Sequence, residues 1–324
     1  RPAPGLRRSR PVVRPGMLTT VQDLGRWGHQ ANGVPVAGPM DSYSHRLANR
    51  QVGNDADAAA LEITLVGPEL DADGDVLCAV CGAHFEITAG GRPVALNRTF
   101  ELHRGERLKF GQRFTGARAT LAVRGGFDLP AVLASRATSL ISSMGPLGGR
   151  AVTAGTILPV GAARAAPPSS AACLPLRLPE GGVRLHAIPR PHQALFEPGA
   201  LDMFFSARFT VSASSNRMGY RLEGPVLAHG PNADILSDAT PIGSVQVPKS
   251  GQPILLMADR QTTGGYPKIA TVIGADLPLA GQLAPGDWVS FAPCTRKEAL
   301  EALHRLERRL AGHAAWRGSW RICA

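Results

Sequence analysis

The sequence has no long apolar run and few aromatic residues. Only 5% of its 324 residues are Phe, Trp or Tyr, so we expect a core of Val, Leu, Ile and Ala. A helix that crosses a bilayer needs about 18 or more consecutive apolar residues, and no such run is present. The N-terminal residues include Arg and Pro but no apolar signal-peptide segment. We therefore predict a cytoplasmic protein with no membrane partner.

Cysteine is also scarce, and its pattern argues against a disulfide framework. The cysteines are odd in number and scattered, at Cys78, Cys81, Cys173, Cys294 and Cys323. The first two form a CxxC, but their run VLCAVCG is typical of a strand, in which residues three apart point to opposite faces. No second CxxC or His pair completes a zinc site. We predict neither metal nor redox chemistry.

The sequence lacks the familiar motifs of nucleotide and cofactor enzymes. It has no GxxxxGK[ST] P-loop, no GxGxxG after a strand, no GxSxG and no HExxH. A biotin-attachment sequence of the AMKM type is missing too, so we expect no covalently attached biotin on this chain. Any nucleotide site must therefore be of another kind.

The formal charge of +10 is concentrated at the two ends of the chain. Residues 1–14 hold five Arg and no acid, and residues 296–324 hold seven Arg or Lys against three Glu. A nucleic-acid-binding protein more often carries basic residues over a folded face, interleaved with aromatic residues. We interpret the ends as solvated charge and predict no nucleic-acid partner.

Turn-forming residues are abundant, with 37 Gly and 27 Pro, and indicate many short strands. We predict a mainly β fold with a few helices, in two β-rich subdomains at residues 12–160 and 183–312, the second with a terminal helix. Residues 1–11 are typical of a disordered basic extension, and residues 313–324 form a tail. The Ala-, Pro- and Ser-rich residues 161–182 are typical of a linker.

Two segments have the pattern of capped helices. One covers residues 40–54, where Asp41 can cap the N-terminus and Gly53 can end the helix. The other covers residues 296–310 and is preceded by a capping box of Thr295 and Glu298. Between Val76 and Phe127 the pattern predicts short strands broken by turns such as HRGE.

The most informative polar cluster is DRQTTGGYPK, which lies between the apolar strands ILLMA and IATVI. Its adjacent glycines, Gly264 and Gly265, let backbone N–H groups point together at an anion, and Lys268 adds positive charge. Asp259 can serve as a general base or hold a metal–nucleotide. The alternative is a long polar hairpin in which the glycines only shape the turn.

Two further clusters carry candidate site residues. In SSNRMGYRLEG, Arg217 can bind a carboxylate with two hydrogen bonds and follows Asn216; the alternative is a surface arginine on a strand. In TTVQDLGRWG, Gln22 and Asp23 share a Gly-rich loop with Arg26 after the first strand; the alternative is an ordinary salt-bridged turn.

These clusters, together with LAVRGGFDLP, resemble one family over about residues 12–305. The family is described as the 5-oxoprolinase C subunit, as KipA, as allophanate hydrolase subunit 2, and as the A and B subdomains of biotin-dependent carboxyltransferases. The resemblance implies an N-terminal carboxyltransferase-type subdomain, a cyclophilin-like β-barrel and a KipI-like partner subunit, with a third subunit in the 5-oxoprolinases.

The resemblance also implies three alternative activities. A 5-oxoprolinase uses ATP, with Mg²⁺, to turn the lactam oxygen of 5-oxoproline into a leaving group and release glutamate. Urea-carboxylase members instead move a carboxyl group from biotin carried elsewhere. A third alternative is a non-catalytic partner of a KipI-like kinase inhibitor.

For the first activity, we expect the three clusters to converge on one anion-binding pocket. Asp23, Asp259 and Lys268 are the expected catalytic residues. The expected substrate-binding residues are Gln22, Asn216, Arg217, Gln246, Gln261, Thr262, Thr263, Gly264, Gly265 and Tyr266.

Overall fold

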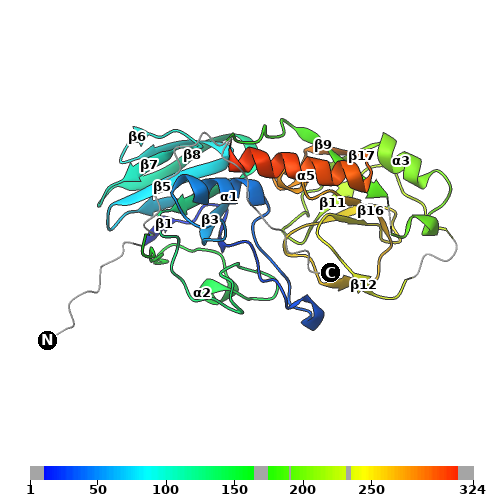
Figure 1. Ribbon diagram of the computed structural model, residues 1–324, viewed down its shortest axis with the longest axis horizontal. Coiled ribbons are helices and arrows are strands. Elements are labelled where there is room, and N and C mark those ends of the chain that lie inside the picture. Colours follow the sequence, from blue (N-terminus) through cyan, green and yellow to red (C-terminus); the bar gives the residue numbers. More distant parts are fainter. Residues whose placement is uncertain (1–10, 164–173, 190, 231–234, 313–324) are drawn as a thin grey trace.

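The computed structural model describes residues 11–163, 174–189, 191–230 and 235–312. Two β-rich units lie side by side along the long axis of the molecule (Figure 1). The predicted extension (apart from Pro11), residues 164–173 of the predicted linker and the predicted tail from residue 313 lie outside the described residues.

The first unit is an eight-stranded sheet in which β1, β4, β8, β3 and β2 follow one another and β5 pairs with β6, β7 and β8. The strands are β1 Val12–Arg14, β2 Leu18–Gln22, β3 Ala60–Thr64, β4 Glu69–Asp71, β5 Val76–Ala89, β6 Arg92–Pro93, β7 Thr99–Leu102 and β8 Arg107–Val123. The short helices η1 (Gln30–Asn32) and α2 (Pro146–Gly149) lie in its connections.

The prediction of only short strands between Val76 and Phe127 is wrong. β5 and β8 are 14 and 17 residues long and pair with each other along most of their length. The pairing register shifts between Gly82 and His84, and again before Ile87. Glycine in this sequence therefore marks bulges within long strands as well as turns between short ones.

Each face of this sheet buries a different set of side chains. Helix α1 (Ser42–Gln51) covers one face, on which Cys81 is buried, while Cys78 belongs to the apolar core on the other face. This confirms the strand assignment of the CxxC. The Asp41 side chain accepts a hydrogen bond of 2.9 Å from the Ser44 backbone N–H, which confirms the predicted N-cap.

The second unit is a closed barrel of seven strands in the order β10-β11-β14-β13-β16-β9-β17. These are β9 Gly182–Pro189, β10 Arg208–Val211, β11 Gly219–Glu223, β13 Ser244–Gln246, β14 Ile254–Leu256, β16 Lys268–Val272 and β17 Trp288–Pro293. A separate ribbon pairs β12 (Asp238–Ala239) with β15 (Thr263–Gly264), and the connections contain η2 (Gln193–Leu195), α3 (Ala200–Ser206) and α4 (Leu277–Ala280). The predicted mainly β fold with a barrel is confirmed.

Three aromatic side chains pack together in the barrel core. The rings of Phe204 and Phe291 stack with centroids 4.3 Å apart, and Phe209 packs against both. All three side chains are almost completely buried. Helix α3 therefore contributes to the barrel core through Phe204.

Helix α5 (Arg296–Ala311) links the two units (Figure 1). It starts at the predicted Thr295–Glu298 capping box beside the barrel. Near its other end, Glu307 accepts hydrogen bonds of 2.6 and 2.7 Å from Arg46 of α1. Arg50 donates to the last two carbonyls of the helix, at 2.8 and 2.6 Å. None of the described helices is long and apolar enough to cross a membrane.

Buried polar contacts join the units beneath α5. The Arg118 guanidinium of β8 donates to the Tyr220 hydroxyl of β11 at 2.8 Å and to the Gly281 carbonyl at 2.6 Å. The Gln282 amide donates to Asp41 at 2.6 Å, and burial raises the pKa of that carboxyl. Buried polar partners require good geometry, so these contacts fix the relative position of the units.

A substitution at Gly281 tests how closely this residue of the barrel unit packs against Met40 of the sheet unit. A Cβ there would lie 2.2 Å from the Met40 carbonyl oxygen, so we expect Gly281→Ala to lower the free energy of unfolding by about 1–3 kcal/mol. Gly274→Ala is the matched control, because a Cβ there meets nothing within 4 Å. Chemical denaturation measures both variants; equal stabilities would contradict the close packing.

Candidate functional site

Arg217 lies at the junction of the two units and binds two buried carboxylates. Its Nε and Nη2 donate to Asp259 at 3.0 and 3.1 Å, and its Nη1 donates to Glu62 of β3. Nη2 also donates to the Gly38 carbonyl at 2.6 Å. Burial alone lowers the pKa of Arg217, but the two carboxylates outweigh it and raise the pKa above its ordinary value.

We expected Arg217 to bind an anionic group of the substrate. In the structure, carboxylates of the protein already occupy its guanidinium. The anions bound to its guanidinium belong to the protein: Asp259 from the barrel and Glu62 from the sheet. All three side chains are at most 4% exposed. Asn216 is exposed beside it, and its side chain accepts a hydrogen bond from the Met218 backbone.

Asp23 organises a second part of the junction. Its carboxylate accepts hydrogen bonds from the Gly25 backbone at 2.9 Å, from the Ser135 hydroxyl at 2.7 Å and from the Arg136 backbone. Residues 132–139 are thereby held against the loop that follows β2. Because both oxygens of Asp23 already accept hydrogen bonds, its geometry is that of a positioning residue, and its role as a base stays a prediction.

Arg26, to which we assigned no role from the sequence, is fully buried in the same place. Its Nε donates to the Val132 carbonyl and its Nη2 to the Ala137 carbonyl, both at 2.8 Å. Its Nη1 has no hydrogen-bond partner among the described residues. Burial lowers the pKa of Arg26, and the charges of Asp23 and Asp259 oppose this shift.

Three more buried atoms in this part of the described structure lack a partner: Gln22 Oε1, Thr138 Oγ1 and His45 Nδ1. The Gln22 side-chain N–H donates a hydrogen bond of 3.0 Å to the Thr138 carbonyl, and the neighbouring Ala137 carbonyl accepts from Arg26. We call Gln22, Arg26, His45 and Thr138 the unpaired group. A buried polar atom without a partner costs about 1–3 kcal/mol, so such a concentration indicates a place prepared for a ligand or water.

The segment that covers Arg26 has strained backbone. Leu133 and Ala134 have φ values of 50° and 60°, in the left-handed region that residues with a Cβ avoid. Two backbone hydrogen bonds between Val132 and Ser135, of 2.8 and 3.2 Å, close this turn. Strain of this kind persists where surrounding contacts impose it and is frequent at functional sites. No sequence signal marked this segment, since it has neither Gly nor Pro at the turn.

The polar hairpin around Gly264 forms a separate set of contacts. Lys268 is buried and donates to the Asp238 carboxylate at 2.6 Å and to the Ala239 carbonyl at 2.7 Å. His192, to which we also assigned no role, accepts a hydrogen bond of 3.2 Å from the Lys268 backbone. Here too the expected anion-binding cation is paired with a carboxylate of the protein.

The remaining predicted residues lie around this hairpin. The Gln261 amide donates to the Gln246 oxygen at 3.3 Å. Thr263 and Gly264 form β15, the Thr262 carbonyl accepts from the Thr240 backbone at 3.0 Å, and Gly265 and Tyr266 are exposed.

The predicted residues thus fall into two groups. The junction holds Gln22, Asp23, Arg217 and Asp259, and the hairpin holds the others apart from the exposed Asn216. One pocket shared by both groups stays a prediction. Among the described residues, no three His, Cys, Asp or Glu side chains are placed to hold a metal ion.

Residues 32–293 match the model of the family described as carboxyltransferase domain, subdomain A and B. The chain belongs to this family, as the resemblance predicted. It is 38% identical to the 5-oxoprolinase C subunit of Escherichia coli, over 94% of this chain and 97% of the relative. It is 35% identical to the 5-oxoprolinase C subunit of Haemophilus influenzae, over 89% and 92%.

A solved structure supports the same membership. The crystal structure of the Kluyveromyces lactis urea carboxylase superposes with a TM-score of 0.88 and 33% identity. The match covers 93% of this chain but only 28% of that protein. The fold is therefore shared by proteins named for different reactions.

Removal of the Arg217 charge tests its place in the junction. We expect Arg217→Met to lower the free energy of unfolding by about 3–5 kcal/mol, because the carboxylates of Asp259 and Glu62 would stay buried without a cation. Arg221→Met is the control, since that side chain is exposed. If urea denaturation gives both variants wild-type stability, the bridge does not hold the units together.

His45 gives a prediction for pH. Burial lowers its pKa from 6.5 to about 4, so between these values only the unfolded state binds the proton. This contribution to stability is complete above pH 6.5 and is lost as the pH falls toward 4, by about 1.4 kcal/mol for each unit. His45→Gln should therefore lose less stability than wild type between pH 6.5 and 4. Parallel curves in pH-dependent denaturation would show that His45 is not buried in its neutral form.

Proposed function

We propose that this chain is a subunit of an ATP-dependent 5-oxoprolinase, which converts 5-oxo-L-proline, ATP and water to L-glutamate, ADP and phosphate. In this proposal it acts in the cytoplasm with a KipI-like subunit and a third subunit. The match to 97% of the length of the Escherichia coli relative supports a role as that subunit.

The observation that carries the proposal is the unpaired group. A lactam ring holds its amide in the cis form, so the N–H and the C=O point to the same side. Gln22 Oε1 is a buried acceptor without a donor among the described residues, and Arg26 Nη1 is a buried donor without an acceptor there. Together they offer an acceptor for the lactam N–H and a donor for its oxygen.

Arg26 would also contribute to the chemistry. As the lactam oxygen donates an electron pair to the γ-phosphorus of ATP and ADP leaves, the transferring phosphoryl group brings negative charge next to that oxygen. A fixed, buried guanidinium stabilises such charge more strongly than water does. Asp23 would act as a positioning residue, because it ties residues 132–139 to the loop that carries Arg26.

Access to these atoms requires movement, since Gln22 and Arg26 are both fully buried. We propose that residues 132–139 open to admit the substrate. The left-handed Leu133 and Ala134 make this segment costly to hold closed, and their strain is relieved on opening. Leu133 is 45% exposed and is available to a partner protein.

The nucleotide remains part of the proposal, but the residues described do not fit Mg–ATP by themselves. No three metal-binding side chains gather anywhere in the described ranges, and Asp23 and Asp259 already accept hydrogen bonds on both oxygens. We therefore assign no step to Mg²⁺ on this chain and propose that the other proteins of the complex provide the rest of the ATP site.

The second candidate function is carboxyl transfer from biotin carried on another protein. The TM-score of 0.88 to the urea carboxylase favours it. Urea also offers an amide N–H and C=O, so the same two residues suit both substrates. The two reactions differ in their co-substrate: the 5-oxoprolinase reaction hydrolyses ATP, whereas the carboxyl transfer uses carboxybiotin.

Reconstitution tests the proposal. We expect the chain, co-expressed with the KipI-like and third subunits, to form glutamate and ADP in equal amounts from 5-oxoproline and ATP. If wild-type complex gives neither product, the proposal is wrong. Transfer of a carboxyl group from carboxybiotin to urea by the same preparation would favour the second candidate.

The variant Arg26→Lys tests the site. A shorter ammonium cannot replace the guanidinium, so we expect turnover to fall about 100-fold or more. Arg98→Lys makes the same change at an exposed position and should leave turnover unchanged. Gel filtration and denaturation show whether Arg26→Lys still folds and assembles; a folded, assembled variant with full turnover would remove Arg26 from the site.

A further inference from the structure

Arg260 lies between β14 and β15 and is only 9% exposed. Its Nε donates a hydrogen bond of 2.7 Å to the Thr240 carbonyl, and its Nη1 makes a long contact of 3.5 Å with the Met257 carbonyl. Its Nη2 makes no hydrogen bond with any described residue and is not fully buried, so a ligand can reach it from solvent. The backbone therefore holds this guanidinium in place and leaves one end of it unused.

Two buried cations close to Arg260 have carboxylate partners, whereas Arg260 has none. Arg217 occupies both oxygens of Asp259, although Asp259 directly precedes Arg260 in the chain. Lys268 donates to the Asp238 carboxylate at 2.6 Å. Among the described residues, no Asp or Glu forms an ion pair with Arg260.

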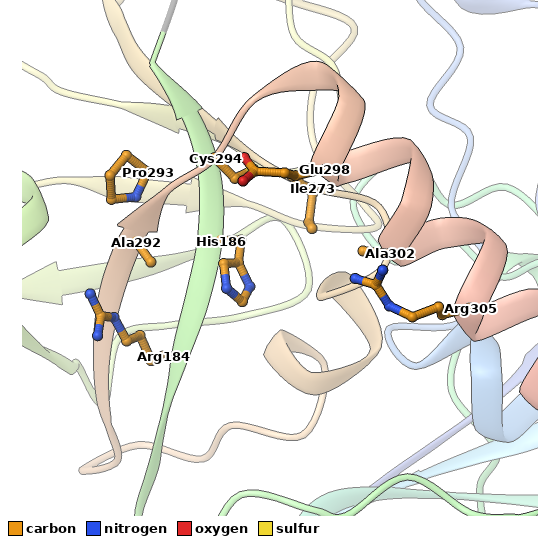
Figure 2. Close-up of a pocket in the computed structure, with 9 residues that line it drawn as sticks. All are labelled: Arg184, His186, Ile273, Ala292, Pro293, Cys294, Glu298, Ala302 and Arg305. Carbon is orange, nitrogen blue, oxygen red and sulfur yellow. The ribbon is translucent and has the colours of Figure 1, made fainter.

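Exposed arginines elsewhere in the protein show why burial matters. A pocket of about 500 Å³ lies between β9, β17 and α5, and Arg184 and Arg305 are among the residues that line it (Figure 2). Both side chains are exposed, so water solvates their charges and neither needs an ion pair. Arg260 is largely removed from water, and a buried charge is stable only when an opposite charge offsets it.

The pKa of Arg260 agrees with a charge that no carboxylate offsets. Burial lowers this pKa to about 10, and no described carboxylate opposes the shift. For Arg217, burial also lowers the pKa, but Asp259 and Glu62 outweigh it. Arg260 still carries its proton at neutral pH, so the described residues leave one positive charge buried without an anion.

The unused end of the guanidinium defines the chemistry of the missing anion. The long contact of Nη1 leaves it available, and Nη1 and Nη2 together present two parallel N–H groups that match the two oxygens of a carboxylate. A carboxylate also carries the single negative charge that balances Arg260. A phosphate group carries about −1.5 to −2 charges at pH 7 and would leave negative charge in excess. A carboxylate therefore fits better than a phosphate.

We propose that Arg260 binds the carboxylate of a small organic acid through Nη1 and Nη2, while the Thr240 carbonyl orients the guanidinium through Nε. This site uses no atom of the unpaired group, and the proposal does not rest on the proposed reaction.

Isothermal titration of the full chain with acetate, acetamide and inorganic phosphate, at constant ionic strength, tests this proposal. Acetamide has nearly the shape of acetate but no charge. We expect acetate to bind at least about tenfold more tightly than acetamide, because acetamide cannot form two charge-assisted hydrogen bonds with Arg260. Undetectable acetate binding, or equal affinities for acetate and acetamide, would overturn the proposal. Phosphate that binds more tightly than acetate would overturn the assignment of a carboxylate.

Variants identify the residue. Arg260→Gln removes the charge and should weaken acetate binding about tenfold or more. Arg260→Lys keeps a cation but not the fork of donors, so it should also weaken binding and serves as the test if the Gln variant does not fold. Arg221→Gln makes the matched change at an exposed position and should leave acetate binding unchanged. Circular dichroism and gel filtration check the fold of each variant. Wild-type acetate affinity in a folded Arg260 variant would place the acetate elsewhere and contradict the proposal.

Discussion

The structure depends on one buried cation that is shared by two units. Arg217 binds Glu62 from the sheet and Asp259 from the barrel, and neither acid has another strong cation in contact among the described residues. A buried charge is tolerated only when it is paired, so each unit completes the other. The Arg118–Tyr220 and Gln282–Asp41 contacts surround this bridge and require the same docking geometry. The junction is therefore a specified position rather than an apolar surface on which the units could slide.

This constraint also explains why unpaired atoms can persist beside the bridge. In the closed position of residues 132–139, their backbone carbonyls hold Gln22 and Arg26 rigidly in place. The same rigidity makes the left-handed turn at Leu133 and Ala134 tolerable, because it is fixed from several sides.

Local features were the most predictable part of the fold. The Asp41 and Thr295 caps follow from short-range hydrogen bonding, and the CxxC strand follows from side-chain alternation. Strand lengths were not predictable, because glycine has the same signature in a bulge as in a turn, and Gly82 lies within a long strand. The family resemblance, rather than periodicity, gave the expectation of a barrel.

The site was only partly predictable for a related reason. Residue types indicated that Arg217 and Lys268 would meet anions, but not that these anions would be Glu62 and Asp238 of the same chain. Such pairs join residues that are distant in sequence, and a single sequence carries no signal for them. Arg26 stands out because its buried Nη1 has no hydrogen-bond partner among the described residues, and only the three-dimensional structure reveals this.

The order in which the barrel strands occur in the chain has a consequence for assembly. Its first strand, β9, pairs in parallel with its last, β17, so the cylinder cannot close until nearly the whole second unit has been synthesised. Contacts between such distant segments form slowly, because a long loop must close first. Helix α5 follows β17 directly and carries the contacts to α1. This helix is therefore the last piece of secondary structure among the described residues to leave the ribosome, and it can lock in place only around a finished barrel.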